Sequence, residues 1–442
     1  MARKMKDSGI EWIGEIPEGW EVHRMKSCIS QRDGGAWGDE ATGETGDCIC
    51  LRIADFDYEH FRFTDSNNLT IRHYASPIIK KLLLQKNDIL IEKSGGGEKT
   101  PVGRTVLFDK EYPALFANFM DRLRCSDFIL PQYLQYVFVT FYKNRYTQNY
   151  IKQTTGIQNL DLSSMLADEF VPVPNLNEQK LIVCYLESKC SKIDNLLSKI
   201  RSSIEEYKKL KQAVITQAVT KGVRGEREMK DSGVEWIGKI PREFDPVQLK
   251  FFCKLITDGT HFSPTTVENG WPYITAGDVH GIGLDYNSAK RISEEDFQLL
   301  VAQGCQPLKG DVLLVKDGAT TGRVGFVDSD TPCVILSSVA MLRPADNTDG
   351  HYLMYLLASD FLQKQILVSM AGSAMPRTTL TKLTKYIGLL PPLHEQKEIA
   401  NYLDAKCAEI DKLIAKKEQL VKELESYKKS LIYEVVTGKR EV

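Results

Sequence analysis

The stretch MKDSGIEWIG, from Met5 to Gly14, recurs as MKDSGVEWIG, from Met229 to Gly238, with one difference in ten positions. A second match follows, because LNEQK from Leu176 to Lys180 returns as LHEQK from Leu393 to Lys397. The offset of this second match is 217 residues, and it holds without a gap for more than forty residues. Solenoid repeats have periods of only about 20–50 residues, so the sequence indicates a duplicated domain.

Between these matches the two halves diverge, although their frame persists. The landmarks that keep their places are Asp88 and Asp311, Lys93 and Lys316, Arg104 and Arg323, Leu123 and Leu342, and Tyr133 and Tyr352. Copies with a common frame and different interiors are expected when each copy recognises a different target. Duplication for stability, as an internal pseudo-dimer, is the alternative interpretation.

Short apolar runs and glycine-containing turns predict a mixed α/β fold for residues 15–175 and 239–392. The expected strands are Cys48–Ala54, Asp88–Glu92, Arg104–Phe108 and Asp121–Cys125, with counterparts at Trp271–Thr275, Asp311–Val315, Arg323–Val327 and Val339–Arg343. The expected short helices are Pro131–Phe141 and Gly350–Leu367.

After each mixed region comes a long segment whose apolar residues recur at alternating steps of four and three, which is typical of a coiled-coil seam. The seam positions are Ile193, Leu197, Ile200, Ile204, Tyr207 and Val214, interrupted by Lys211, and in the second copy Ile410, Ile414, Lys417, Val421, Leu424, Lys428 and Leu431, broadened by Leu413, Leu420 and Tyr427.

We expect Asn177 and His394 to cap the starts of these helices and Gly222 and Gly438 to end them. The fold class is therefore α+β: two mixed α/β domains separated by two long antiparallel coiled-coil helices, with pseudo-two-fold symmetry. An ordinary helical hairpin inside one domain is the alternative.

Composition restricts the possible functions less than the repeat restricts the fold. The chain has 442 residues, 42% hydrophobic and 26% charged, as in soluble globular proteins. No apolar run approaches the ~18–20 residues of a membrane span, so we expect a cytoplasmic protein without membrane contact. The net charge is only −2, which is unusual for a nucleic-acid-binding protein. If the chain binds DNA, local loops or partner subunits must supply the cations.

Motifs for catalysis are missing from the sequence. It contains no GxxxxGK[ST] phosphate loop and no methyltransferase cofactor loop, and Pro332-Cys333 is its only Pro-Cys pair. The ten cysteines form no CxxC pair, and the histidines show no metal-ligand spacing. We therefore expect a non-catalytic protein with no cofactor or metal of its own.

Two glycine-containing loops in each copy are candidate DNA contacts, because small residues let a backbone approach DNA and polar side chains bind phosphates and base edges. The candidates are Lys93, Ser94, Gly95, Arg104, Thr155, Gln158 and Asn159 in the first copy, and Lys316, Gly318, Thr320, Arg323, Ser373 and Arg377 in the second. Each loop is also consistent with an ordinary turn. We expect Trp12 and Trp236 to be structural anchors.

The opening motif and the Leu-x-Glu-Gln-Lys helix starts resemble those of the specificity subunits of type I restriction–modification systems, over essentially the whole chain. The resemblance implies a first target-recognition domain at 1–175, a helical spacer at 176–222, a second target-recognition domain at 223–392 and a second spacer at 393–442. Such a subunit reads a bipartite, asymmetric DNA site in defence against foreign DNA.

The resemblance also implies partners: double-stranded DNA, two adenine-methyltransferase subunits and two restriction endonuclease subunits. S-adenosylmethionine, ATP and Mg²⁺ are then expected on those partners. The docking elements that it implies are the helix starts, with Glu178, Gln179 and Lys180 in the first copy and Glu395, Gln396 and Lys397 in the second.

Two other functions are compatible with the residues alone. One is a structural adaptor whose paired domains bind proteins, which the slight acidity favours. The other is a DNA-binding protein that acts alone, such as an anti-restriction protein.

Overall fold

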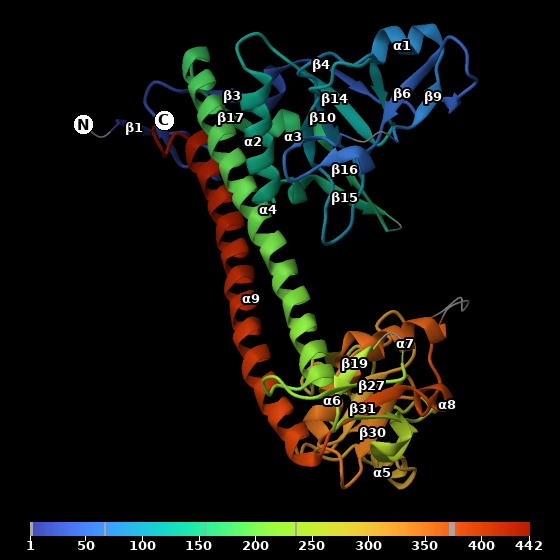
Figure 1. The fold of residues 1–442 in the computed structure, drawn as a ribbon. Coiled ribbons are helices and arrows are strands. Elements are labelled where there is room, and N and C mark those ends of the chain that lie inside the picture. Colours follow the sequence, from blue (N-terminus) through green and yellow to red (C-terminus); the bar gives the residue numbers. More distant parts are fainter. Residues whose placement is uncertain (1–2, 66–67, 155, 235–236, 371–375) are drawn as a thin grey trace. The chain divides into compact units, whose positions relative to one another are not determined.

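The computed structural model describes residues 3–65, 68–154, 156–234, 237–370 and 376–442, and it divides into two compact units. The first unit comprises Met1–Arg201 with Glu418–Val442, and the second comprises Ser202–Lys417. Two long helices, α4 (Leu176–Lys221) and α9 (Leu393–Val436), each contribute to both units (Figure 1).

The first unit is built on a six-stranded sheet in the order β4 (Ile29–Gly34), β14 (Met120–Cys125), β10 (Ile89–Glu92), β12 (Thr105–Leu107), β8 (Arg62–Phe63) and β7 (Phe56–Asp57). A second sheet orders β13 (Ala114–Phe116), β6 (Asp47–Leu51), β9 (Ile71–His73) and β5 (Asp39–Glu40). The smaller ladders join β11 (Ser94–Gly95) to β16 (Ile157–Leu160) and β15 (Ile151–Thr154), β17 (Phe170–Val173) to β3 (Glu21–Arg24), and β1 (Met5–Asp7) to β2 (Glu15–Pro17). The helices are α1 (Ser76–Leu82), α2 (Pro131–Lys143) and α3 (Leu162–Asp168), with short 3₁₀ turns at Met25–Cys28, Ile53–Asp55 and Tyr146–Tyr150.

The second unit has a four-stranded sheet in the order β21 (Cys253–Asp258), β30 (Val339–Pro344), β27 (Val312–Val315) and β28 (Val324–Phe326). A second sheet has the order β22 (Thr266–Val267), β26 (Lys290–Ile292), β23 (Trp271–Ile274) and β29 (Val334–Ile335). The two-stranded ladders join β18 (Met229–Asp231) to β19 (Lys239–Pro241), β20 (Asp245–Gln248) to β31 (Ile387–Leu390), and β24 (Val279–His280) to β25 (Gly283–Leu284). Its helices are α5 (Glu294–Ala302), α6 (Gly350–Ala358), α7 (Asp360–Met370) and α8 (Leu380–Leu383), with a 3₁₀ turn at Leu249–Phe251.

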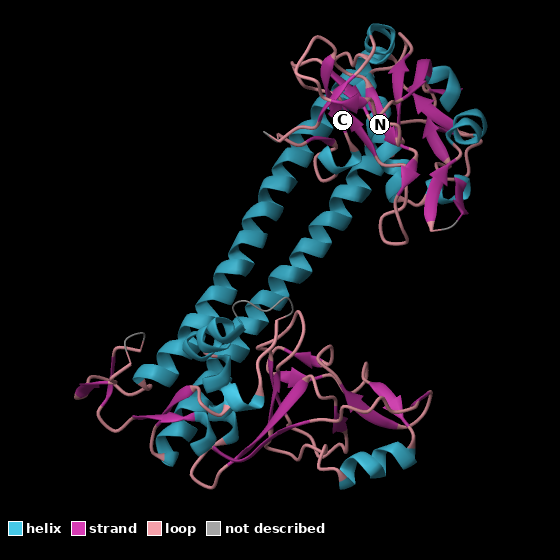
Figure 2. Cartoon of the chain, turned by 90° about the vertical axis from the view of Figure 1, so that its right-hand side faces the viewer, coloured by secondary structure: helices cyan, strands magenta, loops and turns pink. Residues whose placement is uncertain are grey.

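The two units repeat one topology. The ladder β4-β14-β10-β12 of the first corresponds to β21-β30-β27-β28 of the second, and β17-β3 corresponds to β31-β20. The parallel pair β13-β6 matches the parallel pair β29-β23. Both units contain strands together with helices (Figure 2), so the expected mixed α/β class is confirmed.

Each expected strand is present, within a few residues of its predicted bounds. The predicted helix at Gly350–Leu367 is instead two helices, α6 and α7. The break lies at Ser359, whose backbone is extended with a ψ of 148° and whose buried hydroxyl donates to the carbonyl of Leu356.

The caps also differ from the expectation. Asn175, not Asn177, caps α4, because its Oδ1 accepts a hydrogen bond from the Glu178 amide at 3.0 Å. Helix α9 begins at Leu393, directly after Pro392, and His394 lies inside it. Gly222 and Gly438 follow the two helix ends with φ of 73° and 72°, a left-handed conformation that suits glycine.

The core of each unit is completed by the end of the helix that starts in the other copy. Leu431, Ile432, Val435 and Val436 of α9 are buried among residues of α2 and the start of α4 in the first unit. Ile215, Ala218 and Val219 of α4 are buried in the same way in the second unit. Residues distant in the chain therefore fold together.

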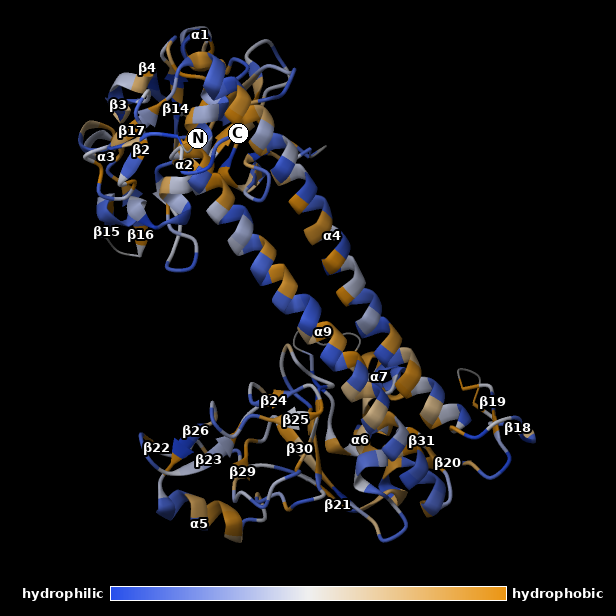
Figure 3. Ribbon diagram, turned by 90° about the vertical axis from the view of Figure 1, so that its left-hand side faces the viewer, coloured by the Kyte–Doolittle hydropathy of each residue, from blue (hydrophilic) through white to orange (hydrophobic). Residues whose placement is uncertain are grey.

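The coiled-coil pattern of α4 and α9 is confirmed, with apolar positions set between hydrophilic ones along both helices (Figure 3). Ile193, Leu197 and Ile204 are buried along α4. The broader stripe predicted on α9 is wrong, because Leu413, Leu420 and Tyr427 are 36%, 42% and 47% exposed.

Candidate nucleic-acid interface

In the first unit the structure brings the two candidate loops together as one small sheet. Strand β11 pairs with β16, so that Ser94 lies opposite Asn159 and Gly95 opposite Gln158. The Ser94 hydroxyl donates to Oδ1 of Asn159 at 2.7 Å, and the Leu160 amide donates to the carbonyl of Lys93. Residues more than sixty positions apart in the sequence are therefore neighbours in one small sheet.

The second unit repeats this junction with different side chains. Asp317 and Arg377 form an antiparallel bridge, and the Gly318 amide donates to the carbonyl of Pro376. The Thr378 amide donates to the carbonyl of Lys316 at 2.9 Å, as the Leu160 amide does to Lys93. The Arg377 guanidinium also contacts the Asp317 carboxylate at 2.9 Å.

A lysine directly follows β10 in the first unit and β27 in the second. The strand that supplies its carboxylate partner is not the corresponding one in the two units. Lys93 contacts Asp121 of β14 at 2.7 Å, whereas Lys316 contacts Asp258 of β21 at 3.2 Å. The register pairs Asp121 with Gly34, and Ala340 with Asp258. Gly34 leaves room for the Lys93 head, because a Cβ there would lie only 3.3 Å from Nζ of Lys93. The lysine is thus balanced by a different strand in each unit.

Three of the candidate DNA contacts are corrected by their burial. Arg104 makes a bidentate ion pair with Glu92, at 2.7 and 2.8 Å, and only 15% of its side chain is exposed. Burial raises the pKa of Glu92, although the Arg104 guanidinium opposes that rise. Gln158 is buried and accepts a hydrogen bond from the Val102 amide, and Lys316 is 3% exposed between Asp258 and Asp317. These side chains hold the junctions together.

The other candidates remain at the surface or lie outside the described residues. Asn159, Arg323 and Arg377 are exposed, whereas Lys93, Ser94, Gly95, Gly318 and Thr320 are half-buried beside them. Gly95 and Gly318 have φ of 118° and 98°, which only glycine adopts readily. Thr155 and Ser373 lie outside the described residues, as does Trp236, while Trp12 is a buried anchor against Phe141.

Exposed apolar side chains at the junctions were missed by the sequence reasoning. Phe119 is 49% exposed, and its carbonyl accepts hydrogen bonds from the amides of Lys93 and Ser94. Ile157, in the β15–β16 hairpin, is 54% exposed. Phe262 is 51% exposed and lies two residues after Thr260, which is bridged to Leu336 in the second unit. Such residues can contact thymine methyl groups or unstacked bases. The sequence signal that could have identified these residues is an apolar residue within a polar turn.

The glutamines of the two helix starts have an internal role, which corrects their assignment to partner binding. Gln179 is fully buried: its Oε1 accepts from the Leu130 amide, and its Nε2 donates to the carbonyls of Phe128 and Pro174. Gln396 makes the same three bonds, to Asp349, Asn347 and Pro391.

The charged neighbours divide into two kinds. Glu395 is 1% exposed and contacts Arg227 at 2.6 Å, so it is internal as well. Glu178 is 21% exposed and paired with Arg3. Lys180 and Lys397 are exposed, which leaves them as the free parts of the predicted docking motif.

Among residues 3–65, 68–154, 156–234, 237–370 and 376–442, no group of three or more His, Cys, Asp or Glu side chains is placed to hold a metal ion. No helix in these ranges is long and apolar enough to cross a membrane.

Comparisons with known proteins agree on one family. The family model described as the type I restriction modification DNA specificity domain matches residues 45–206 and 241–423, more than half of the chain. The type I restriction enzyme MjaVIII specificity subunit of Methanocaldococcus jannaschii is 27% identical over 81% of this chain and 80% of its own length. The putative MjaX specificity subunit of the same organism is 26% identical over 97% of this chain and 95% of its own length.

Two solved structures share the fold. One, from work on complex assembly and conformational transition of the type I R-M system, has a TM-score of 0.72 and 17% identity, covering 96% of this chain and 99% of that chain. The HsdS subunit from Thermoanaerobacter tengcongensis has a TM-score of 0.50 and 17% identity, covering 96% and 98%.

Proposed function

Because the chain belongs to the type I restriction–modification DNA specificity family, a non-catalytic family of sequence-recognising subunits, we propose that each unit reads one half of a bipartite, asymmetric site in double-stranded DNA. The junction of two loops in each unit carries this proposal. One frame presents Ser94 and Asn159 in the first unit, and Asp317 and Arg377 in the second. Identical frames with different side chains suit two different half-sites.

The proposed contacts are the accessible residues of the junctions. They are Lys93, Ser94, Gly95 and Asn159 with the undescribed Thr155 in the first unit, and Gly318, Thr320, Arg323 and Arg377 with the undescribed Ser373 in the second. Phe119, Ile157 and Phe262 join them as apolar contacts. Few of these side chains carry a positive charge, and this agrees with a net charge of −2 and with partner subunits that supply further phosphate contacts.

We also propose the partners. Two adenine-methyltransferase subunits dock near Lys180 and Lys397, and two restriction endonuclease subunits join for cleavage, within the cytoplasm. The S-adenosylmethionine, ATP and Mg²⁺ used in methylation and cleavage are expected on those partners.

The domain division proposed is recognition at 1–175 and 223–392 and helical spacing at 176–222 and 393–442. Exchange of residues 15–175 for the matching domain of a relative tests it. We expect methylome sequencing to show that only one half of the methylated motif changes. The exchange must keep Leu431, Ile432 and Val435, because these residues of α9 complete the core of the first unit. A change in both halves, or in neither, would contradict modular reading.

The long helices are proposed to set the gap between the half-sites. Asp194 pairs with Lys428 in the first unit and Lys211 with Asp411 in the second, so an insertion in one helix needs a matching insertion in the other. Seven residues added after Ser203 and seven after Gln419 preserve the seam and add about 10 Å of helix. The expected result is a gap wider by about three base pairs at 3.4 Å each. An unchanged gap in the methylome would refute the spacer role.

A further inference from the structure

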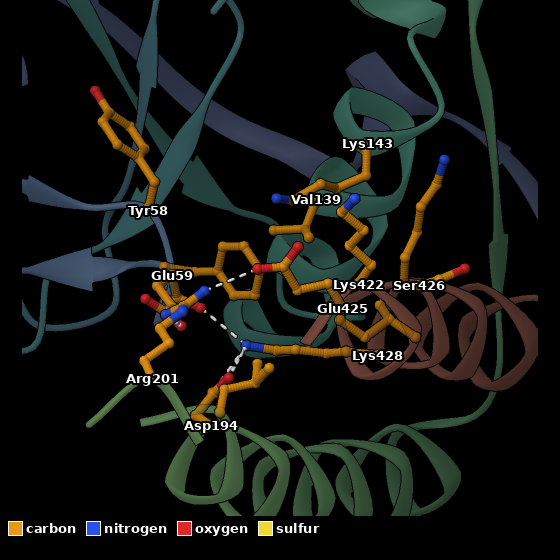
Figure 4. Close-up of a pocket in the computed structure, with 14 residues that line it drawn as sticks. Tyr58, Glu59, Val139, Lys143, Asp194, Arg201, Lys422, Glu425, Ser426 and Lys428 are labelled. Atoms are coloured by element: carbon orange, nitrogen blue, oxygen red, sulfur yellow. Dashed lines mark hydrogen bonds and ion pairs between the residues drawn. The ribbon is translucent and has the colours of Figure 1, made fainter. Parts of the chain in front are cut away.

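A cavity of about 580 Å³ lies in the first unit and is lined by none of the proposed DNA contacts. Its walls come from the turn after β7, the end of α2, α4 and the C-terminal part of α9 (Figure 4). The volume falls within the ~300–1,000 Å³ typical of small-molecule sites.

The cavity carries an excess of positive charge. Five cationic and three anionic side chains line it, and the three anions are already paired. Asp194 contacts Lys428 at 2.6 Å, and Glu59 and Glu425 contact Arg201 at 2.7 and 2.8 Å.

Three lysines remain: Lys143 of α2, and Lys422 and Lys429 of α9. They have no ion pair among the described residues. Figure 4 shows Lys143 and Lys422 on the same side of the cavity. All three side chains are exposed. Partial desolvation by neighbouring atoms and the nearby charge of Lys428 nevertheless lower the pKa of Lys143. An anion bound between these lysines would offset their mutual repulsion.

The second copy has other residues in place of these lysines. At the matching sequence offsets the second copy holds Glu205 and Gln212 in α4, and Leu362, which lies in α7 beyond the break at Ser359. There the Gln212 side chain donates to the carbonyl of Ala358 at 2.6 Å, and both residues line a different pocket. The cluster of lysines is therefore particular to the first unit, where α2 runs unbroken to Lys143, whereas its counterpart is broken at Ser359.

The rest of the wall is apolar, and one of its residues is strained. Phe61, Val139, Leu197 and Ile432 line the cavity. Phe61 has a φ of 59°, the left-handed region that a bulky residue rarely occupies. The carbonyl of Phe61 accepts a hydrogen bond from Gln135 at 2.7 Å, which holds this conformation. Strained backbone of this kind is concentrated at ligand sites.

We propose that this cavity binds a nucleoside polyphosphate, with its phosphates among Lys143, Lys422 and Lys429 and its base against the wall around Phe61. A small aromatic ligand with several negative charges matches both the surplus cations and the apolar surface. Bound there, it contacts α2, α4 and α9 together and stabilises the folded first unit. DNA recognition by the loop junctions does not depend on this site.

The test is isothermal titration of the full chain with ATP, tripolyphosphate and adenosine. The key variant, Lys143→Leu with Lys422→Glu and Lys429→Gln, introduces the residues of the second copy. The control variant, Lys26→Gln with Lys192→Gln and Lys209→Glu, makes the same charge change at exposed positions outside the cavity.

We expect ATP to bind the wild-type chain and the control alike, and the key variant at least tenfold more weakly. Adenosine and tripolyphosphate should each bind more weakly than ATP. Absence of ATP binding to the wild type, or equal loss in both variants, overturns the proposal, and tripolyphosphate binding as tightly as ATP overturns the base contact. Circular dichroism melting checks that the variants fold. If the key variant does not, Lys422→Glu alone should weaken ATP binding at least threefold, and unchanged binding would overturn the proposal.

Discussion

Lys428 of α9 donates two hydrogen bonds to the Asp194 carboxylate of α4, at 2.6 and 2.8 Å, and both side chains are nearly buried. The duplicated counterparts, Lys211 and Asp411, make the same contact at 2.7 Å, with the helices exchanged. A charged pair interrupts the apolar seam in each unit and fixes the register of the antiparallel helices. A polar seam position is an established device for specifying register.

Exposure predicts that the two pairs differ in their contribution to stability. Asp194 is 8% exposed, whereas Asp411 is 49% exposed. Lys428→Met leaves a buried carboxylate unpaired and should destabilise the first unit by about 3–5 kcal/mol. Lys211→Met should cost the second unit less than about 1 kcal/mol. Urea unfolding measures both changes, and the double variant Asp194→Leu with Lys428→Met should recover most of the loss. Equal losses for the two lysine variants would contradict this assignment.

Gln179 should be essential for folding. Gln179→Ala leaves the Leu130 amide and the carbonyls of Phe128 and Pro174 without this partner. Each buried group left unsatisfied costs about 1–3 kcal/mol. Lys180→Ala, at the exposed neighbouring position, should change stability by less than about 0.5 kcal/mol. Urea unfolding distinguishes the two variants, and a stable Gln179→Ala chain would show that the three bonds are dispensable.

The sequence predicted the frame of the fold well, because duplication and periodicity are long-range signals. Strands such as β10 and β27 followed from repeated landmarks, and the helices α4 and α9 followed from periodicity. The pairing of the two loops in each unit was not predicted. The burial of Gln179 was missed, although the sequence contains a signal for it, because Gln179 precedes Ile182, Leu186 and Ile193 at seam-like steps of three, four and seven.

The exposure and the ion-pair partners of individual charged side chains could not be inferred in the same way. Arg104 and Arg323 occupy equivalent places in the sequence, yet only 15% of the Arg104 side chain is exposed, whereas Arg323 is exposed. The difference depends on Glu92, whose counterpart is Val315. Likewise, the carboxylate beside Lys93 comes from β14, and the one beside Lys316 comes from β21. Contacts across a sheet are set by tertiary register, which a single sequence does not reveal.

Arg104 and Arg323 should therefore respond differently to the same substitution. Arg104→Ala removes the partner of buried Glu92 and should destabilise the first unit by about 3 kcal/mol. Arg323→Ala should leave unfolding unchanged and weaken DNA binding. Parallel urea unfolding and fluorescence anisotropy on a duplex separate these effects. If Arg104→Ala lost DNA affinity with unchanged stability, Arg104 would instead belong to the DNA interface.

Acid should loosen the segment around α3 in the first unit. Asp161 accepts a hydrogen bond from the Ser164 amide and contacts Lys152, and these interactions lower its pKa to about 2. Because the folded pKa lies below the unfolded value of about 3.9, the stabilisation is complete above pH ~4 and is lost as the pH falls towards 2. NMR titration of the carboxyl carbon should show the low midpoint, and Lys152→Ala should raise it. A midpoint near 4 in the wild type would refute the pairing.

Arg377 offers the sharpest test of DNA reading in the second unit. Its side chain is 60% exposed and is oriented by Asp317 at 2.9 Å, so it can leave or keep that contact without unfolding the unit. If it reads a base, Arg377→Ala should cost about 1–3 kcal/mol of binding on the cognate duplex and relax the preference at one position. If it contacts a phosphate, affinity should fall uniformly across sequences and the salt slope should decrease by about 1. Anisotropy titrations of the assembled complex at several salt concentrations, on cognate and single-mismatch duplexes, distinguish the two. Unchanged affinity on every duplex would place Arg377 outside the interface.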